Sequence, residues 1–291
     1  MCIRDSSWYN AQYKLNDHAK LPQLVQLTKN QSGSVFAEAS NRAIRSSLLS
    51  SEAVGAVVEN ATQHLTQDWE QLMDADAGGL ADQLYQVSRL IVARHQFRAE
   101  RDVFYVDLGG FDVHNNVIDG MEARCGMIDN PLRVFVEEMK AQGVWDDVVV
   151  QTVSDFARTL VFNGKGTDHS CGITRERTRT ACCLVVNAKV LLTTISGVRV
   201  CVRRWGGNMF TFGGKVKGAQ MFGDFPSLDL QSDLIIDPRR GSLIPTTPWE
   251  GMWKALASWF GVEDEHLHEI MPNLANFPPS VLRSVEEMFH P

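Results

Sequence analysis

Two short segments hold carboxylates and imidazoles at spacings that suit metal-ion chemistry. Asp112 and His114 are separated by one residue, so both side chains can point the same way from a strand end or loop and reach one ion. Asp168 and His169 end the glycine-bounded loop Gly164-Lys-Gly-Thr-Asp-His, whose backbone permits close approach to an ion. All four are therefore candidate metal ligands. The alternative is that Asp112 caps a following helix while His114 is merely solvated.

A third segment, Ser154-Asp155-Phe-Ala-Arg158-Thr159, adds a carboxylate and a cation. Asp155 is a further candidate metal ligand, and Arg158 could neutralise an anionic substrate oxygen through its planar guanidinium. The alternative is a helix-capping Asp155 with Arg158 in a surface ion pair. Ser154 and Thr159 are hydroxyls near the predicted site, but neither is assigned as a nucleophile.

The elements that must position these residues are short apolar runs. Asp102–Leu108 and Val148–Val153 are rich in β-branched and aromatic residues and too short for helices, which predicts two strands. The intervening 130–143 segment has near-helical apolar spacing and ends at a glycine suited to a helix C-terminus. Strand, helix and strand together predict a right-handed parallel crossover. Ligands bind at the carboxyl ends of such strands, where Asp112 and Asp155 follow.

Other patterns extend this α/β reading. Residues 34–98 are mostly helix-compatible, and an apolar stripe between Gly79 and Arg94 predicts a helix that covers a sheet face. Short strands are expected at 208–214 and 219–223. Helices are expected from Pro248 to Gly261 and from Pro279 to Phe289. The stripe is Leu80, Leu84, Val87, Leu90 and Ile91, and the aromatic side chains expected on a packed face are Trp249, Trp253 and Phe260.

Composition narrows the function classes. The formal net charge of −7 gives no general nucleic-acid footprint, so no nucleic-acid partner is expected. No apolar stretch approaches the roughly 18 to 20 residues of a membrane span, and the N-terminus lacks the apolar region of a secretory signal, so the compartment stays open. The six cysteines predict neither a disulfide framework nor a paired-cysteine zinc site. Oligomeric state is not indicated.

Residues 171–204 differ from their surroundings. They hold seven Lys or Arg and one acidic residue, and without them 21 basic and 34 acidic residues would give a formal charge of −13. Removing the stretch would bring Ser170 directly before Trp205-Gly-Gly-Asn208. The sequence therefore predicts a foreign insertion. A weaker alternative is a basic arm for polyanions, which would bind in a salt-sensitive manner.

An ordered series of motifs resembles the domain of unknown function 1501 (DUF1501) family, a sulfatase-like branch of the alkaline phosphatase superfamily. The resemblance covers about residues 10–170 and 205–278. The motifs are Gly109-Gly-Phe-Asp112-Val-His114, Ser154-Asp155-Phe-Ala-Arg158-Thr159, Asn163-Gly-Lys-Gly-Thr-Asp168-His169, Trp205-Gly-Gly-Asn208 and Leu243-Ile-Pro-Thr-Thr247-Pro-Trp249.

This resemblance implies an alkaline phosphatase-like open, mostly parallel sheet flanked by helices and N-terminally incomplete. It also implies that a missing N-terminal portion supplies one metal-binding Asp and the nucleophile. The family usually has Ser-Glu-Phe-Gly-Arg where this chain has Asp155 and Ala157, so a carboxylate is kept on a shorter arm. Family members run from Thr-Asp-His almost at once into Trp-Gly-Gly-Asn, which suggests a retained intron or assembly fault at 171–204. Sequencing the spliced transcript tests that hypothesis.

The predicted organisation is a non-native lead at 1–8, the central part of an alkaline phosphatase-like domain at 9–170, the basic insertion at 171–204, and the rest of the same domain at 205–291. We expect a metal-dependent, sulfatase-like or phosphatase-like ester hydrolase, inactive as the fragment given, acting on a small anionic ester. Its cofactor would be a divalent ion, zinc, calcium, magnesium or manganese. The alternative is a non-catalytic binding or surface-associated module on the same fold. The family resemblance suggests export.

Overall fold

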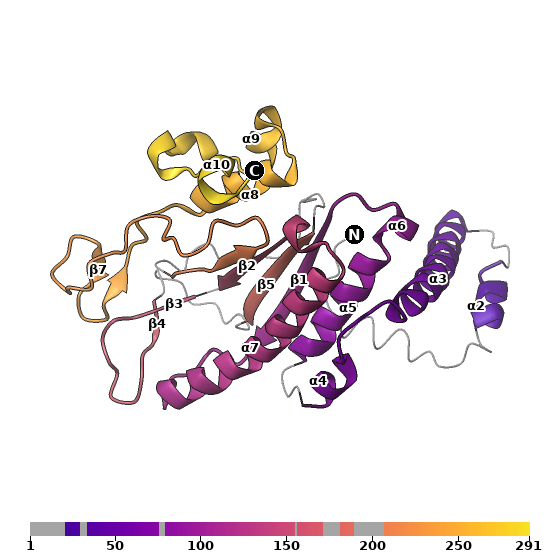
Figure 1. The fold of residues 1–291 in the computed structure, drawn as a ribbon, viewed down its shortest axis with the longest axis horizontal. Coiled ribbons are helices and arrows are strands. Elements are labelled where there is room, and N and C mark those ends of the chain that lie inside the picture. Colours follow the sequence, from indigo (N-terminus) through magenta and orange to yellow (C-terminus); the bar gives the residue numbers. More distant parts are fainter. Residues whose placement is uncertain (1–20, 30–33, 76–78, 155, 171–180, 189–206) are drawn as a thin grey trace.

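The computed structural model describes residues 21–29, 34–75, 79–154, 156–170, 181–188 and 207–291 (Figure 1). They form a mixed α/β protein with small antiparallel sheets. The helices are α2 (Leu21–Leu27), α3 (Val35–Thr62), α4 (Trp69–Ala75), α5 (Leu80–Val92), α6 (Arg94–Phe97), α7 (Val117–Ala141), α8 (Trp249–Phe260), α9 (Leu267–Ile270) and α10 (Val285–Met288), with 3-10 turns η1 (Trp145–Asp147), η2 (Asp264–His266), η3 (Leu274–Asn276) and η4 (Pro279–Val281). The strands are β1 (Asp102–Gly109), β2 (Val148–Ser154), β3 (Ala157–Arg158), β4 (His169–Ser170), β5 (Ala181–Ala188), β6 (Thr211–Gly213), β7 (Ile235–Asp237) and β8 (Ser242–Leu243).

The main sheet has the strand order β1-β5-β2-β6. The two predicted strands are present as β1 and β2, and both run antiparallel to β5, which lies between them. They therefore point in the same direction, as a β-α-β crossover requires, but they are not neighbours. Every pairing within the described residues is antiparallel, so the expected open, mostly parallel sheet is not shown.

The strand β5 belongs to the basic stretch at 171–204, of which residues 181–188 are described. Its backbone is in register with β1 from Asp102 to Gly109 and with β2 from Val148 to Ser154. The hypothesis that this stretch is a foreign insertion concerns the transcript and stays a prediction. The lead at 1–8 lies outside the described residues.

Helices cover both faces of β2. Val148 and Val150 are buried in a core shared with α5 and α7, whereas Val149 is buried on the opposite face in a second core with Leu256 of α8 and Met288 of α10. Figure 1 shows α5 and α7 side by side across the sheet, with the C-terminal helices α8, α9 and α10 gathered above it at the top of the view. A continuous apolar run is typical of such a doubly covered strand.

The helix α5 confirms the predicted stripe. Leu80, Leu84, Val87, Leu90 and Ile91 are all buried, and they pack against β1 and α7. Gln83 adds a polar link, because its side-chain amide donates to the backbone oxygen of Asp107 at 2.8 Å and accepts from the Asp107 N–H at 2.8 Å. This amide pairs with β1 much as a neighbouring strand would.

The helix α7 is longer than predicted. It begins at Val117 rather than near Asn130, so Pro131 lies inside it rather than in its first turn. An interior proline removes one helical hydrogen bond, but Pro131 is buried with Val134 and Phe135, and this packing offsets the loss. The predicted end is confirmed: Gly143 follows the helix with φ 67°.

A buried carboxylate joins α7 to the start of α4. Glu138 is fully buried and accepts hydrogen bonds from the backbone N–H groups of Thr66 and Gln67, each at 2.9 Å. The Thr66 hydroxyl and the Gln142 amide donate to the same carboxylate at 3.2 Å and 2.8 Å. These four donors replace the water that a carboxylate would otherwise need.

The C-terminal elements match the expectations in part. The helix α8 spans the predicted range, and Phe260 is buried, but Trp249 is 40% exposed. The expected final helix is divided into η4 and α10, because the chain is extended before Ser284, whose side chain forms a capping box with Glu287. Residues 208–214 contribute β6, while 219–223 form no strand. None of the described helices is long and apolar enough to cross a membrane.

Candidate functional site

The first half of the candidate site is the loop after β1. Gly110 has φ 90°, which lets the chain turn sharply out of the strand. The turn brings Asp112 and His114 together, with 2.8 Å between His114 Nε2 and Asp112 Oδ1. Asn116 then adopts a left-handed conformation before α7 begins at Val117. Asp112 is therefore not the residue immediately before the helix.

The second half is the 163–170 loop, which is shaped by its own polar side chains. The Asn163 side-chain oxygen accepts from the N–H groups of Lys165 at 3.0 Å and Gly166 at 2.8 Å, which closes an Asx-type turn. The buried hydroxyl of Thr159 accepts from the Asp168 N–H at 3.1 Å. Asp168 and the first residue of β4, His169, are thereby held beside the first loop.

Close backbone contacts fasten the two loops together. The Asn116 N–H donates to the Lys165 carbonyl oxygen at 3.1 Å. Gly166 packs so tightly that a Cβ atom there would lie 2.4 Å from Val117 Cγ2 and 2.7 Å from the His114 carbonyl oxygen. A glycine is therefore required at position 166 for this approach.

Arg158 forms hydrogen bonds to the backbone of both loops. Its Nη1 donates to the Thr167 carbonyl oxygen at 2.8 Å, and its Nη2 donates to the Phe111 carbonyl oxygen at 2.6 Å. Burial lowers the pKa of Arg158, and the nearby Asp112 and Asp168 oppose that shift. Because two of its donors hold backbone oxygens, the guanidinium acts in this structure as a support for the site. Its predicted contact with an anionic substrate stays a prediction.

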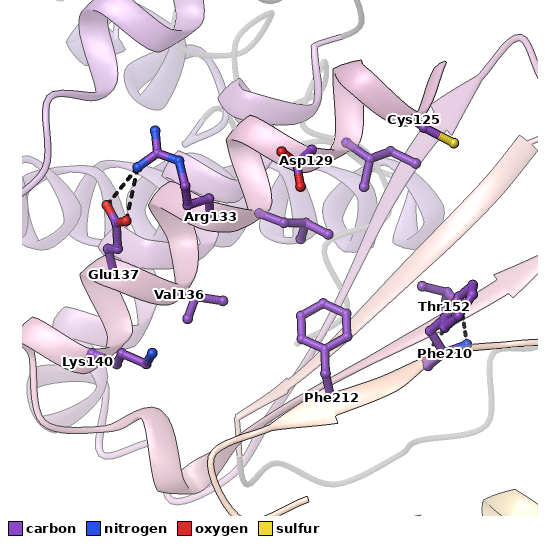
Figure 2. A pocket seen from close by; sticks show the side chains of 11 residues that line it. Cys125, Asp129, Arg133, Val136, Glu137, Lys140, Thr152, Phe210 and Phe212 are labelled. Carbon is purple, nitrogen blue, oxygen red and sulfur yellow. Dashed lines mark hydrogen bonds and ion pairs between the residues drawn. The ribbon is translucent and has the colours of Figure 1, made fainter. Parts of the chain in front are cut away.

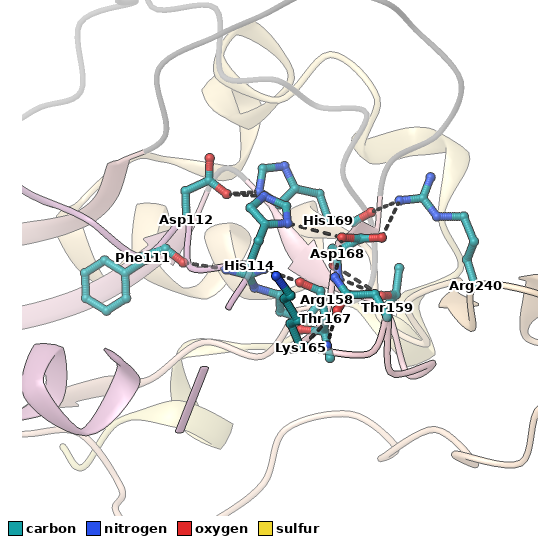
Figure 3. Close-up of polar contacts among 12 residues, drawn as sticks. Phe111, Asp112, His114, Arg158, Thr159, Lys165, Thr167, Asp168, His169 and Arg240 are labelled. Atoms are coloured by element: carbon teal, nitrogen blue, oxygen red, sulfur yellow. Dashed lines mark hydrogen bonds and ion pairs between the residues drawn. The ribbon is translucent and has the colours of Figure 1, made fainter. Parts of the chain in front are cut away.

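Three potential metal-ligand atoms meet between the loops. His114 Nε2 and His169 Nε2 both contact Asp112 Oδ1, and one ligand atom from each residue lies within 4.8 Å of the other two (Figure 3). The imidazole of His169 stacks on Phe156 with 4.1 Å between ring centroids, which fixes the orientation of the ring. Asp112 and His114 are 40% and 43% exposed, so solvent and small molecules reach the cluster.

Asp168 lies behind this trio. Its Oδ1 is 3.2 Å from His114 Nδ1, the nitrogen on the opposite side of the ring from Asp112. The pKa of Asp168 is lowered, first by the hydrogen bond from Asn163 at 2.8 Å, then by the one from His114, with Arg240 adding to the effect. Asp168 can therefore accept a hydrogen bond from His114 Nδ1, while Nε2 of the same ring faces Asp112.

The structure thus brings together four of the five predicted ligands, Asp112, His114, Asp168 and His169, while Asp155 lies outside the described residues. Sequence reasoning gave no role to Arg240, whose Nη2 is 3.9 Å from Asp168 Oδ2 and donates to the His169 carbonyl oxygen at 3.2 Å. It lies 71 residues beyond His169, in a segment that reads as an ordinary loop. The one signal in the sequence that could have indicated Arg240 is the pair of basic residues Arg239 and Arg240 before a glycine.

Two other places among the described residues resemble sites. Glu263, Glu265 and His266 also place ligand atoms within 4.8 Å of one another, but all three are exposed, and His266 Nδ1 pairs with Glu269 at 2.8 Å. They form an ordinary solvated surface cluster.

A groove of about 590 Å³ lies between α7 and the sheet (Figure 2). Ile128, Leu132, Val136 and Phe212 make it largely apolar. None of the lining residues is a histidine, and Glu137 in its wall is paired with Arg133 at 3.0 Å. Converging ligand chemistry is therefore found at the Asp112 cluster and not in this groove.

Fold and site together define an α/β protein with an Asp-His-His cluster held between two loops. The chain belongs to the DUF1501 family, described as a protein of unknown function, whose sequence profile matches residues 8–174 and so more than half of the chain. The match includes both loops of the cluster but not Arg240. No curated protein and no solved structure matches the chain.

Proposed function

We propose that this chain binds a divalent metal ion through Asp112, His114 and His169 and contributes the metal centre of a phosphoric or sulfuric ester hydrolase. The observation that carries the proposal is the convergence of one carboxylate oxygen and two imidazole nitrogens from segments 55 residues apart. Both imidazoles point at the same carboxylate oxygen, which is the arrangement that a shared cation would hold together.

The donor set narrows the choice of metal. Imidazole nitrogens suit zinc and other transition metals, whereas calcium and magnesium prefer all-oxygen sites. Two imidazoles and one carboxylate therefore favour zinc over calcium, magnesium and manganese. Three protein ligands with open positions are also typical of catalytic rather than structural zinc.

Asp168 has a supporting role in this proposal. Catalytic metal sites often hold a ligating histidine through a carboxylate on its other nitrogen, which fixes the tautomer and the orientation of the ring. The 3.2 Å contact between Asp168 Oδ1 and His114 Nδ1 fits that pattern. We therefore revise its predicted role from metal ligand to positioning residue. Asn163 in turn orients Asp168 through the hydrogen bond at 2.8 Å.

The chemistry proposed is ester hydrolysis, in which a bound divalent ion polarises a phosphoryl or sulfuryl oxygen and lowers the pKa of a water molecule. The nearby hydroxyls are engaged elsewhere: Ser154 donates to the Phe156 carbonyl oxygen at 2.9 Å, and Thr159 is buried against the Asp168 backbone. Neither is placed as a nucleophile. An alkaline phosphatase-like, sulfatase-like ancestry is part of this proposal and follows from the motif resemblance alone.

The test measures bound metal before activity. Purified protein is loaded with zinc or manganese, dialysed, and analysed for metal per chain, beside Asp112→Ala, His169→Ala and the control Asp129→Asn, an exposed carboxylate of α7 outside the cluster. One metal per chain, retained in the control and lost in both alanine variants, supports the centre. Hydrolysis of p-nitrophenyl phosphate and p-nitrophenyl sulfate is then assayed. Hydrolysis of either ester would support the hydrolase. Stoichiometric metal without hydrolysis is the result expected of a fragment that lacks the nucleophile, and it would support the metal centre alone.

A further inference from the structure

We infer that Arg240 binds the anionic group of the substrate beside the Asp112 cluster and so makes the site selective for phosphate or sulfate esters. This inference rests on the proposed function, because it concerns the substrate of the same site. Arg240 approaches from the side of Asp168, opposite the loop that carries Asp112 (Figure 3). Its Nη2 reaches the His169 carbonyl oxygen at 3.2 Å, so the guanidinium lies directly against a residue of the metal cluster.

The backbone holds Arg240 at this position. It lies in the turn between β7 and β8, where its N–H and that of Gly241 both donate to the Asp237 carbonyl oxygen, at 3.1 Å and 2.7 Å. The turn is joined to the segment after β3 by two backbone hydrogen bonds. The Leu160 N–H donates to the Gly241 carbonyl oxygen at 3.0 Å, and the Val161 N–H donates to the Arg240 carbonyl oxygen at 3.2 Å.

Gly241 allows this junction because it has φ 68° and because a Cβ atom there would lie 2.7 Å from Leu160 Cβ. The same β3 segment carries Arg158 and Thr159, whose side chains form hydrogen bonds to the backbone of the 163–170 loop. Arg240 is therefore fixed to the scaffold of the cluster itself.

The charges at the cluster favour a cation beside the substrate. Asp112 and Asp168 place two carboxylates at the cluster, and these repel an anionic ester unless cations compensate. Arg158 has two donors committed to backbone oxygens. Arg240 is 47% exposed, and its side-chain contacts with the residues that the structure describes are made by Nη2. A planar guanidinium with this exposure can pair with two oxygens of a phosphate or sulfate group.

The experiment measures anion binding separately from metal binding. Zinc-loaded protein is titrated with inorganic phosphate and, in a second arm, with inorganic sulfate, by calorimetry. The variants are Arg240→Ala, Arg240→Lys and the control Arg239→Ala, which is 93% exposed in the same turn and contacts Asp237 at 3.6 Å. Because a charged hydrogen bond contributes about 1.5–3 kcal/mol, we expect Arg240→Ala to weaken anion binding roughly 10- to 100-fold with metal content unchanged. Arg240→Lys should recover part of the affinity, and Arg239→Ala should match the wild type.

The outcomes separate this inference from the proposed function. Metal bound by every protein with anion affinity unchanged in Arg240→Ala would overturn the role of Arg240 and leave the metal centre intact. Anion binding that depends on Arg240 in a protein that holds no metal would support Arg240 and overturn the metal proposal. Loss of metal in Arg240→Ala would show that the side chain positions His169 instead. Failure of the wild type to bind either anion would also overturn the inference.

Discussion

Substitutions of Asp168 test whether this carboxylate supports His114 or binds the metal ion itself. In Asp168→Asn the introduced amide oxygen can still accept from His114 Nδ1 and Asn163 Nδ2, now at 3.2 Å and 2.8 Å from Oδ1, but the negative charge is lost. The amide nitrogen would then face Arg240, which lies 3.9 Å from Oδ2 and is itself a donor. Asp168→Ala removes both contacts and frees the His114 ring.

Loss of a carboxylate that supports a ligating histidine typically costs 10- to 100-fold in metal affinity. The amide variant keeps the acceptor and should lie at the lower end, about 1.4 kcal/mol, and the alanine variant at the upper end, about 2.7 kcal/mol. Zinc titration by calorimetry measures both, with Asp129→Asn as a control for charge. Wild-type affinity in Asp168→Ala would refute the supporting role. Complete loss of metal in Asp168→Ala, as in the ligand variants, would show that Asp168 binds the ion directly.

Two further predictions address the scaffold. Glu138→Ala removes a fully buried carboxylate that accepts from the N–H groups of Thr66 and Gln67. A hydrogen bond to a charged group contributes about 1.5–3 kcal/mol, so the free energy of unfolding should fall by about 3–6 kcal/mol, measured by urea denaturation. The exposed control Glu137→Gln should change it by under about 1 kcal/mol, and equal effects would contradict this account. Gly166→Ala should weaken zinc binding while the circular dichroism spectrum is kept, because the added methyl group pushes against the His114 backbone. The control Gly109→Ala has open space for its methyl group and should bind zinc normally. Normal zinc binding in Gly166→Ala would show that the loops tolerate separation.

Much of the fold could be predicted from local patterns. The strands β1 and β2 and the helices α5 and α8 follow from apolar periodicity and glycine ends, because these features reflect burial of a single face or a short run. The start of α7 was missed because a proline usually marks a first turn, and only tertiary burial shows that Pro131 is tolerated inside the helix. The order of strands in the sheet could not be predicted either, because the pairing of β1 and β2 with β5 depends on contacts between distant segments.

The site was predictable wherever the motif spacing itself encodes proximity. Asp112 with His114, and Asp168 with His169, are each local pairs of candidate ligands, and the first pair follows a predicted strand. That the two pairs meet depends on tertiary contacts between their loops. The division of roles could not be read from spacing, because it depends on which imidazole nitrogen faces which carboxylate. Arg240 was missed for a similar reason: backbone hydrogen bonds between its turn and the β3 segment bring it to the cluster.

The most direct test of the account is the zinc content of the wild-type protein beside His114→Ala, with affinity measured by titration in the same preparation. The account predicts one zinc per chain in the wild type and loss of stoichiometric zinc in His114→Ala, with the circular dichroism spectrum retained. A wild-type protein that holds no zinc and no manganese after loading, or a His114→Ala variant that binds zinc as tightly as the wild type, would contradict the proposed metal centre.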